Sequence, residues 1–265
     1  MSRIIAVTNQ KGGVGKTTTT ENLGIGLSRL GYKVLLIDMD PQGSLTESLG
    51  FNNPDTMPVT LANVLAREIN DYEFDRSYGL IHHEEGIDLI PGNIELSALD
   101  MQLVNIMSRE TILKSYLHKI QDDYDYILID CMPSLGMLTI NAFTAASSVL
   151  IPVQAAYLPA KGLVQLLKTV QKIRRGLNPD LVIEGMVFTM VDERTHFTKE
   201  IESLIKEQYG AGMRIFETRI PFSIKTAEST ASGKSIFLYA PKNPVAFAYK
   251  NLTDELVNNP LIEAQ

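Results

Sequence analysis

The amino-acid sequence predicts an α/β fold in which a mostly parallel, twisted β-sheet is flanked by helices on both faces. Short runs of β-branched and apolar residues, typical of strands buried on both sides, recur along the 265 residues. Longer segments with apolar residues at helical spacing separate most of these runs. Because strands joined through helices lie parallel, this alternation requires helices on both faces of the sheet.

The first half of the chain shows the alternation clearly. The first predicted helix has Leu23, Leu27 and Leu30 on one face, and a polar stretch at 50–60 interrupts the pattern. The predicted elements are strand 3–9, helix 16–30, strand 33–38, helix 60–70, strand 86–91 and helix 95–121.

The second half continues the pattern to its last helix, and no segment has the composition of a linker. We therefore predict a single domain over residues 1–265. The predicted elements are strand 124–130, strand 148–153, helix 160–176, strand 181–190, helix 195–209, strand 215–220 and helix 244–258.

The composition predicts a cytoplasmic protein. Cys131 is the single cysteine, which excludes an intramolecular disulfide and fits a reducing compartment. Met1 leads directly into the first strand, so no signal peptide is expected. No apolar run reaches the roughly 18 residues that a membrane-spanning helix needs.

The charge is unevenly distributed. The net charge of −7 argues against nucleic acid as a partner, but residues 161–250 hold 14 Lys and Arg against 9 Asp and Glu. Local clustering of basic residues decides whether a protein binds a phosphate backbone. A DNA-binding surface in this part of the chain and ordinary solvated helix faces are both consistent with the count.

Residues 11–18, Lys-Gly-Gly-Val-Gly-Lys-Thr-Thr, predict a phosphate-binding loop between the first strand and the first helix. The glycines let backbone N–H groups surround phosphate oxygens, and the helix N-terminus adds its positive dipole. Lys16 would neutralise the β- and γ-phosphates, and the Thr17 hydroxyl would bind Mg²⁺. The residues predicted to bind the nucleotide here are Lys11, Gly12, Gly13, Val14, Gly15, Lys16, Thr17 and Thr18.

Three aspartates at the ends of predicted strands complete a nucleotide-hydrolysing site. Asp38 and Asp40 follow the strand at 33–38, where alternate residues share one side. One of the two would orient the attacking water, and the other would hold metal-bound waters or the loop lysines. Asp130, at the end of strand 124–130, would contact Mg²⁺ through water.

These motifs together resemble the ParA family, the partition ATPases of the deviant Walker A (MinD/ParA) group with a P-loop NTPase-like fold. The likeness also rests on segments 129–136, 152–154 and 189–195, and it runs in order from about residue 3 to 250. No further domain is expected before the first strand, and in this the chain resembles the short Soj-like branch that lacks an N-terminal helix-turn-helix.

The resemblance implies a nucleotide-gated cycle. ATP would join two subunits face to face, with Lys11 of each reaching the partner's phosphates and Gly12 where the two loops meet. Asp40 would position the attacking water, so that Lys11, Lys16 and Asp40 form the catalytic set. The ATP homodimer would bind double-stranded DNA non-specifically, in association with the nucleoid, and a ParB-type centromere-binding protein would stimulate hydrolysis.

The resemblance also implies residues outside the phosphate loop. Asp38 joins the nucleotide-binding set, and the base would be recognised by residues near the ends of two later strands: Met190, Asp192 and Pro221. Phe222 stands where the family commonly has arginine, so the DNA contacts transfer less securely than the ATP site. The candidate DNA-binding residues are Lys225, Arg219, Arg194 and Lys199.

Three other functions are known for proteins with similar motifs or could use the same nucleotide site. A MinD-like membrane protein needs a basic amphipathic C-terminal helix, whereas residues 251–265 contain no Lys or Arg. An electron carrier of the nitrogenase-reductase kind needs two cysteines per subunit to hold its cluster. This function is excluded because Cys131 is the single cysteine. A DNA-bound regulator that uses the nucleotide only as a conformational ligand stays open, although Asp40 argues for turnover.

Overall fold

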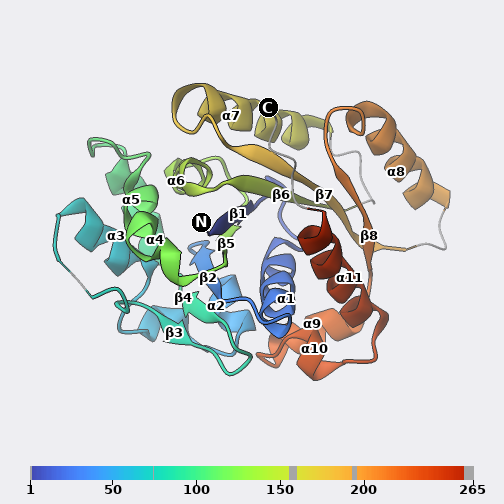
Figure 1. The fold of residues 1–265 in the computed structure, drawn as a ribbon, viewed down its shortest axis with the longest axis horizontal. Helices are drawn as coiled ribbons and strands as arrows, with labels where there is room; N and C mark the ends of the chain where they lie inside the picture. The colour runs from blue at the N-terminus through green and yellow to red at the C-terminus, as the bar shows by residue number, and fades with distance from the viewer. Residues whose placement is uncertain (1, 74, 155–159, 193–195, 260–265) are drawn as a thin grey trace.

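The computed structural model describes residues 2–73, 75–154, 160–192 and 196–259, and it contains an eight-stranded sheet (Figure 1). The strand order is β3-β4-β2-β5-β1-β6-β7-β8. The strands are β1 (Arg3–Val7), β2 (Val34–Met39), β3 (Ile81–His82), β4 (Asp88–Ile90), β5 (Tyr126–Cys131), β6 (Ser148–Gln154), β7 (Val182–Val191) and β8 (Ile215–Pro221).

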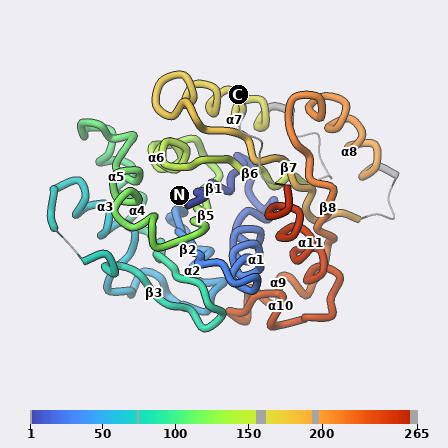
Figure 2. The backbone as a smooth tube through the Cα atoms, viewed as in Figure 1, coloured from blue at the N-terminus to red at the C-terminus, as the bar shows by residue number. Residues whose placement is uncertain are grey.

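All neighbouring strands are parallel except β3 and β4, which pair antiparallel at one edge. The strand order places the first strand inside the sheet: β1 lies between β5 and β6, as the tube in Figure 2 shows. The carboxyl ends of β1, β2 and β5 meet at one edge of the sheet, because Val7 is in register with Asp130 and Asp130 with Asp38. This edge positions the site described below.

Helices cover both faces, which confirms the predicted fold class. Along β1, Ile4 and Ala6 belong to one apolar cluster and Ile5 and Val7 to the other, as the strand period of two requires. The first cluster is completed by α3 (Leu61–Ile69), α4 (Glu95–Leu103), α5 (Ile112–Ile120), α6 (Met137–Ala145), α7 (Ala160–Gly176) and α8 (His196–Tyr209). The second is completed by α1 (Lys16–Arg29), α2 (Ser44–Ser48), α10 (Ile236–Tyr239) and α11 (Pro244–Asn258).

The predicted helix 95–121 is wrong in extent, because the chain forms α4 and α5 with a turn between them. Ser108 adopts a left-handed conformation (φ 52°) in that turn, which an α-helix cannot accommodate. The Asp100 Oδ1 of α4 accepts a hydrogen bond from the Leu138 N–H (2.9 Å), at the start of α6. The break lets α4 and α5 pack against α6.

Several short elements were not predicted. The apolar side chains of α6 surround it on all sides, because the helix is buried between the sheet and its neighbours, so it shows no amphipathic pattern. The other elements missed are α2, β3, α9 (Ile224–Ala231), α10 and two 3₁₀ turns at Pro54–Thr56 and Gln121–Asp123. Within the described part of the chain, no helix is both long and apolar enough to cross a membrane.

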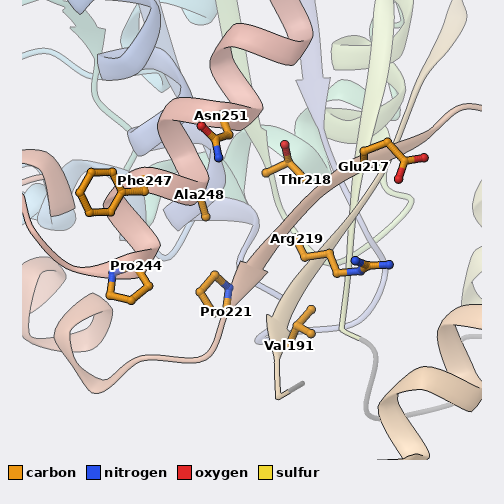
Figure 3. A pocket seen from close by; sticks show the side chains of 9 residues that line it. All are labelled: Val191, Glu217, Thr218, Arg219, Pro221, Pro244, Phe247, Ala248 and Asn251. Atoms are coloured by element: carbon orange, nitrogen blue, oxygen red, sulfur yellow. The ribbon is translucent and has the colours of Figure 1, made fainter. Parts of the chain in front are cut away.

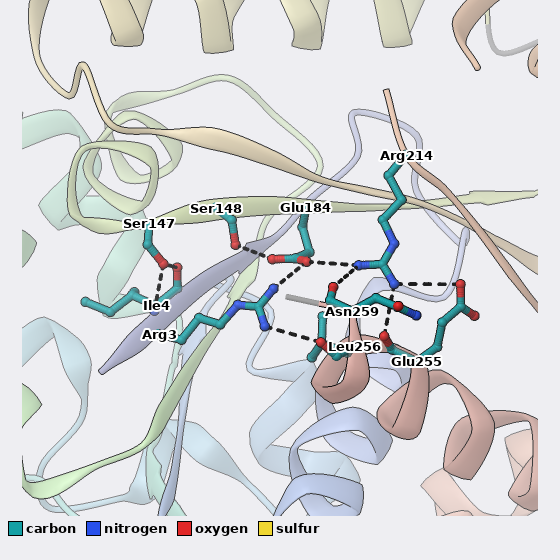
Figure 4. A network of polar contacts seen from close by, with 9 residues as sticks. All are labelled: Arg3, Ile4, Ser147, Ser148, Glu184, Arg214, Glu255, Leu256 and Asn259. Atoms are coloured by element: carbon teal, nitrogen blue, oxygen red, sulfur yellow. Dashed lines mark hydrogen bonds and ion pairs between the residues drawn. The ribbon is translucent and has the colours of Figure 1, made fainter. Parts of the chain in front are cut away.

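A buried carboxylate on β7 links the C-terminal helix α11 to the sheet through two arginines (Figure 4). Glu184 on β7 is fully buried and pairs with Arg3 (2.6 Å) and Arg214 (3.7 Å). Arg214 also donates to the Glu255 carbonyl oxygen of α11 (3.0 Å). Because each charge is paired and hydrogen-bonded, the network fixes α11 against β1 and β8.

Candidate functional site

The phosphate loop lies between β1 and α1, at the central edge of the sheet. Gly13 (φ 71°) and Gly15 (φ 81°) adopt left-handed backbone conformations, which residues with a Cβ rarely take. Gly15 immediately precedes α1, so the N-terminus of a 14-residue helix points at the loop. This combination of loop and helix dipole is a site for a phosphate group.

Lys16 begins α1 and its side chain is buried, with 7% of the residue exposed. Its amine lies 3.5 Å from the Lys11 carbonyl oxygen, at the limit of a hydrogen bond. A buried ammonium group is stable only beside negative charge or strong acceptors. The geometry therefore fits an anionic group bound in the loop.

Thr17 and Thr20 both contact Asp130, the carboxylate at the end of β5. The Thr17 Oγ1 donates to one oxygen (2.7 Å) and the Thr20 Oγ1 to the other (3.3 Å). Burial, then the nearby Asp38 charge, raise the pKa of Asp130 to about 8. A hydroxyl and a carboxylate at this spacing are the oxygen donors that Mg²⁺ takes directly or through water, so the pair fits the predicted metal position.

Asp38 and Asp40 lie in different environments. Asp38 is fully buried and accepts hydrogen bonds from the N–H (2.8 Å) and hydroxyl (2.6 Å) of Thr46, in the short helix α2. Burial raises the pKa of Asp38 to about 6. Asp40 is only partly buried, and its Oδ1 accepts from the Gln42 N–H (3.0 Å) in a tight turn. Asp40 is therefore the carboxylate of the two that solvent and a substrate can reach.

A cavity of about 380 Å³ opens beside the phosphate loop and is lined by Gly15, Thr18, Met190, Pro221 and Phe222, among others. Met190 adopts a left-handed conformation (φ 52°), and its Cε approaches the space above Gly15. The neighbouring Thr189 hydroxyl donates to the Val14 carbonyl oxygen (2.8 Å), which fixes the end of β7 to the loop.

This mostly apolar cavity is continuous with the phosphate loop and fits a nucleoside base. Met190 and Pro221, two of the residues that the sequence assigns to base recognition, line this cavity. Asp192, partly buried, follows β7 and is not among the residues that line the cavity.

Lys11 and Gly12 are exposed at the outer side of the loop. The Lys11 amine donates to the Gln154 Oε1 (3.3 Å) at the end of β6. A Cβ built on Gly12 meets no atom within 4 Å, and Gly12 is not among the glycines with positive φ. A side chain at position 12 is therefore tolerated within one subunit.

The candidate DNA-binding residues do not all gather at one place. Lys199 and Arg219 line the same hollow of about 510 Å³, where the Arg219 Nε pairs with Glu202 (2.9 Å). Arg219 also borders a second hollow of about 650 Å³ and extends away from Phe247 (Figure 3). Lys225 lies apart on α9, half-exposed, and pairs with Glu228 (2.6 Å). Arg194 lies outside the described residues.

Sequence reasoning assigned no role to several residues that shape the site. Asn9 and Gln154 contact Lys11, and Thr46 contacts Asp38. Asn9 is buried at the end of β1, and a polar residue ending a buried strand beside a glycine-rich loop is the signal that could have identified it.

Glu21 is an unusual member of α1, one turn beyond Thr17. It is fully buried, and its Oε1 has no hydrogen-bond partner among the described residues. Burial raises the pKa of this carboxyl well above its usual value, against a smaller opposing effect of the Ser48 hydroxyl. The folded state therefore holds the Glu21 proton more tightly than the unfolded state, so stability falls as pH rises from the unfolded pKa of about 4.3 through the folded pKa.

We expect Glu21→Gln to make the nucleotide-free protein more stable at pH 8 and to make its loss of stability between pH 5 and 8 shallower. The reason is that the amide fills the same space and never ionises. Urea unfolding at several pH values measures the effect, with Glu47→Gln, an exposed glutamate of α2, as the control. Parallel pH profiles for Glu21→Gln and the unaltered chain would show that Glu21 does not titrate in this range.

Comparison with known proteins identifies close relatives. A profile for a family described as an AAA domain matches residues 2–183. The chain is 42% identical to the sporulation initiation inhibitor protein Soj of Bacillus subtilis, over 98% of this chain and the whole of that protein. It is 38% identical to the chromosome partitioning protein ParA of Myxococcus xanthus, over 97% of this chain and 88% of that protein.

A solved structure supports the ligand assignment. The chain resembles a structure of cobyrinic acid a,c-diamide synthase from Mycobacterium smegmatis with bound ATP analog and magnesium, with a TM-score of 0.84 and 36% identity. The likeness covers 97% of this chain and 95% of that one. ATP and Mg²⁺ are therefore the cofactors of this chain.

Proposed function

This chain belongs to the ParA family of partition ATPases, and we propose that ATP gates its binding to DNA. It is an ATPase that uses ATP and Mg²⁺. In the proposed cycle residues 1–265 act as one ATPase domain, ATP joins two subunits, and the dimer binds DNA of any sequence on the nucleoid in the cytoplasm. A ParB-type centromere-binding protein then stimulates hydrolysis and releases the subunits.

The observation that carries the proposal is the convergence of Lys16, Thr17 and Asp130 at one end of the sheet, beside an apolar cavity. Lys16 would hold the β- and γ-phosphates, and the cavity with Met190 and Pro221 would hold the base. Mg²⁺, held by Thr17 and through water by Asp130, supplies charge neutralisation at the phosphates. Asp40, which solvent can reach, would orient the attacking water.

The dimer part of the proposal rests on the exposed side of the loop. Lys11 and Gly12 are exposed there, and Lys11 lies outside the set of groups around Asp130. An ammonium group delivered by a second subunit would complete the charge around the transferred phosphoryl group, so that hydrolysis requires the dimer. The open space around Gly12 within one subunit supports a contact that belongs to the partner.

We expect Gly12→Val to prevent the ATP-dependent dimer while leaving ATP binding by the monomer within about threefold, because an added isopropyl group in a closely packed interface costs more than it does in open space. Sedimentation with a non-hydrolysable ATP analogue and Mg²⁺ measures the dimer. Gly176→Val, at the last residue of α7 where an added Cβ also meets open space, is the matched control. A Gly12→Val dimer of normal affinity would exclude this face as the interface.

DNA binding by the dimer would use basic side chains from the C-terminal third. Lys199 and Arg219 share one hollow, and Lys225 stands half-exposed on α9. Their partners Glu202 and Glu228 are carboxylates that a DNA phosphate would have to replace. Such contacts are electrostatic, independent of sequence and weakened by salt.

We expect Lys225→Glu to weaken DNA binding about tenfold or more at 100 mM salt and to lower the salt slope by about one, because it removes one phosphate contact and adds repulsion. Lys119→Glu is the matched control, since Lys119 is equally exposed (51%) and also pairs with a glutamate. Fluorescence anisotropy on a random-sequence duplex measures both. Equal affinities of Lys225→Glu and the unaltered chain would move the DNA surface away from α9.

A further inference from the structure

The beginning of the phosphate loop is fastened to the neighbouring strand β6 by one buried amide. The Asn9 Nδ2 donates to the Pro152 carbonyl oxygen (2.8 Å), and the Asn9 Oδ1 accepts from the Lys11 N–H (3.0 Å). Asn9 is 6% exposed, so both hydrogen bonds are shielded from water. The backbone of Lys11 is thereby held at a fixed distance from the end of β6.

The side chain of Lys11 also points toward the end of β6. Its amine donates to the Oε1 of Gln154, the last residue of β6, at 3.3 Å. Gln154 comes two residues after Pro152, so the acceptor of Asn9 and the acceptor of the Lys11 amine lie on the same strand end. The amine of Lys16, by contrast, lies inside the loop beside the Lys11 carbonyl oxygen. The two lysines of the loop thus point to different sites.

We propose that Gln154 is a positioning residue for Lys11: its amide oxygen holds the Lys11 amine within its own subunit until an ATP-bound partner withdraws it. The inference rests on the proposed function, in which Lys11 acts on the partner's phosphates. Asn9 sets the backbone position from which the side chain reaches Gln154. Dimer formation then exchanges a neutral acceptor on β6 for the phosphates of the second subunit.

The contact is a hydrogen bond from a charged donor at an exposed position. Its loss should raise the fraction of subunits in which the Lys11 amine can reach a partner by about threefold. A symmetric dimer withdraws two lysines, and the two factors multiply. The apparent dissociation constant of the ATP dimer should therefore fall about tenfold in Gln154→Ala, because the competent fraction of each subunit rises.

Gln154→Glu should act in the opposite direction. A carboxylate of nearly the same size at this position would form an ion pair with Lys11 and hold it more firmly. The dimer should weaken by about tenfold at low salt, and the difference should disappear at high salt, because exposed ion pairs are screened. A purely structural role for Gln154 would make both substitutions weaken the dimer, with no dependence on salt.

The first measurement is the rate of reductive methylation of the Lys11 amine in the full chain without nucleotide, followed by mass spectrometry, with Lys199 as the internal reference. The expected rate rises about threefold in Gln154→Ala and falls in Gln154→Glu. The second is the dissociation constant of the dimer with a non-hydrolysable ATP analogue and Mg²⁺. Gln165→Ala, an exposed glutamine of α7, is the matched control.

Opposite shifts of the two variants in both measurements would support the inference. Unchanged labelling of Lys11 in both variants, or a weaker dimer in both, would overturn it. Lack of an ATP-dependent dimer in the unaltered chain would contradict the proposed function instead, and the labelling rates would still decide whether Gln154 holds Lys11.

Discussion

Replacing Lys16 by alanine is expected to abolish ATP binding. Lys16 is buried at the start of α1, and its amine has the Lys11 carbonyl oxygen at 3.5 Å as its hydrogen-bond acceptor. In the bound state this ammonium group would face the β- and γ-phosphates with little water between them. Removing one member of a buried charge pair costs about 3 to 5 kcal/mol, so the affinity should fall by about 100-fold or more.

Titration calorimetry with ATP and Mg²⁺ measures this loss. Lys33→Ala is the control, because Lys33 is an exposed lysine that precedes β2, at the end of the sheet opposite the phosphate loop. Thermal unfolding of Lys16→Ala without nucleotide should show a folded protein, since removing a buried charge relieves a desolvation cost. ATP affinity within about threefold of the unaltered chain would show that the phosphates bind elsewhere.

Replacing Asp40 by alanine is expected to leave ATP bound but to stop its hydrolysis. Asp40 is the more exposed of the two aspartates at the end of β2. Its carboxylate accepts a hydrogen bond from the Gln42 N–H in a tight turn. A positioned general base or water-orienting group contributes about 10² to 10⁴ in rate. Since Asp40 contacts neither Lys16 nor Thr17, the binding of ATP should change little.

The substitution Asp40→Asn separates the role of Asp40 in hydrolysis from its role in shaping the turn. The asparagine Oδ1 can still accept from the Gln42 N–H, so the loop should keep its shape while the carboxylate charge is lost. We expect the asparagine and alanine variants to be equally slow in single-turnover hydrolysis. Asp122→Asn, at an exposed aspartate after α5, should hydrolyse ATP at the normal rate. Normal turnover by Asp40→Asn would show that another residue orients the attacking water.

Much of the fold and the site could be predicted because the signals are local. The phosphate loop, its flanking strand and helix, and Asp130 at a strand end each depend on residues close together in the sequence. The order of strands in the sheet then brings Asp130 to Thr17, more than 100 residues away. Strand alternation alone was enough to place both on the same edge.

The remaining features depend on tertiary contacts. Helix α6 has no amphipathic pattern because it is buried between the sheet and its neighbouring helices, with apolar residues on all of its sides. The Thr46 hydroxyl reaches Asp38 only because the short helix α2 turns back over the strand end. The contacts of Asn9 with Pro152 and of Lys11 with Gln154 require the adjacency of β1 and β6, whose segments are more than 130 residues apart. No periodicity in the sequence encodes that adjacency.

The central claim is that ATP gates DNA binding. The most direct test is the binding of Asp40→Ala protein to a random-sequence duplex with ATP, with ADP and without nucleotide, at 100 and 300 mM salt. The account predicts tight binding with ATP alone, weakened strongly at the higher salt because phosphate contacts release counterions. Equal binding in all three nucleotide states, or no binding in any of them, would contradict it.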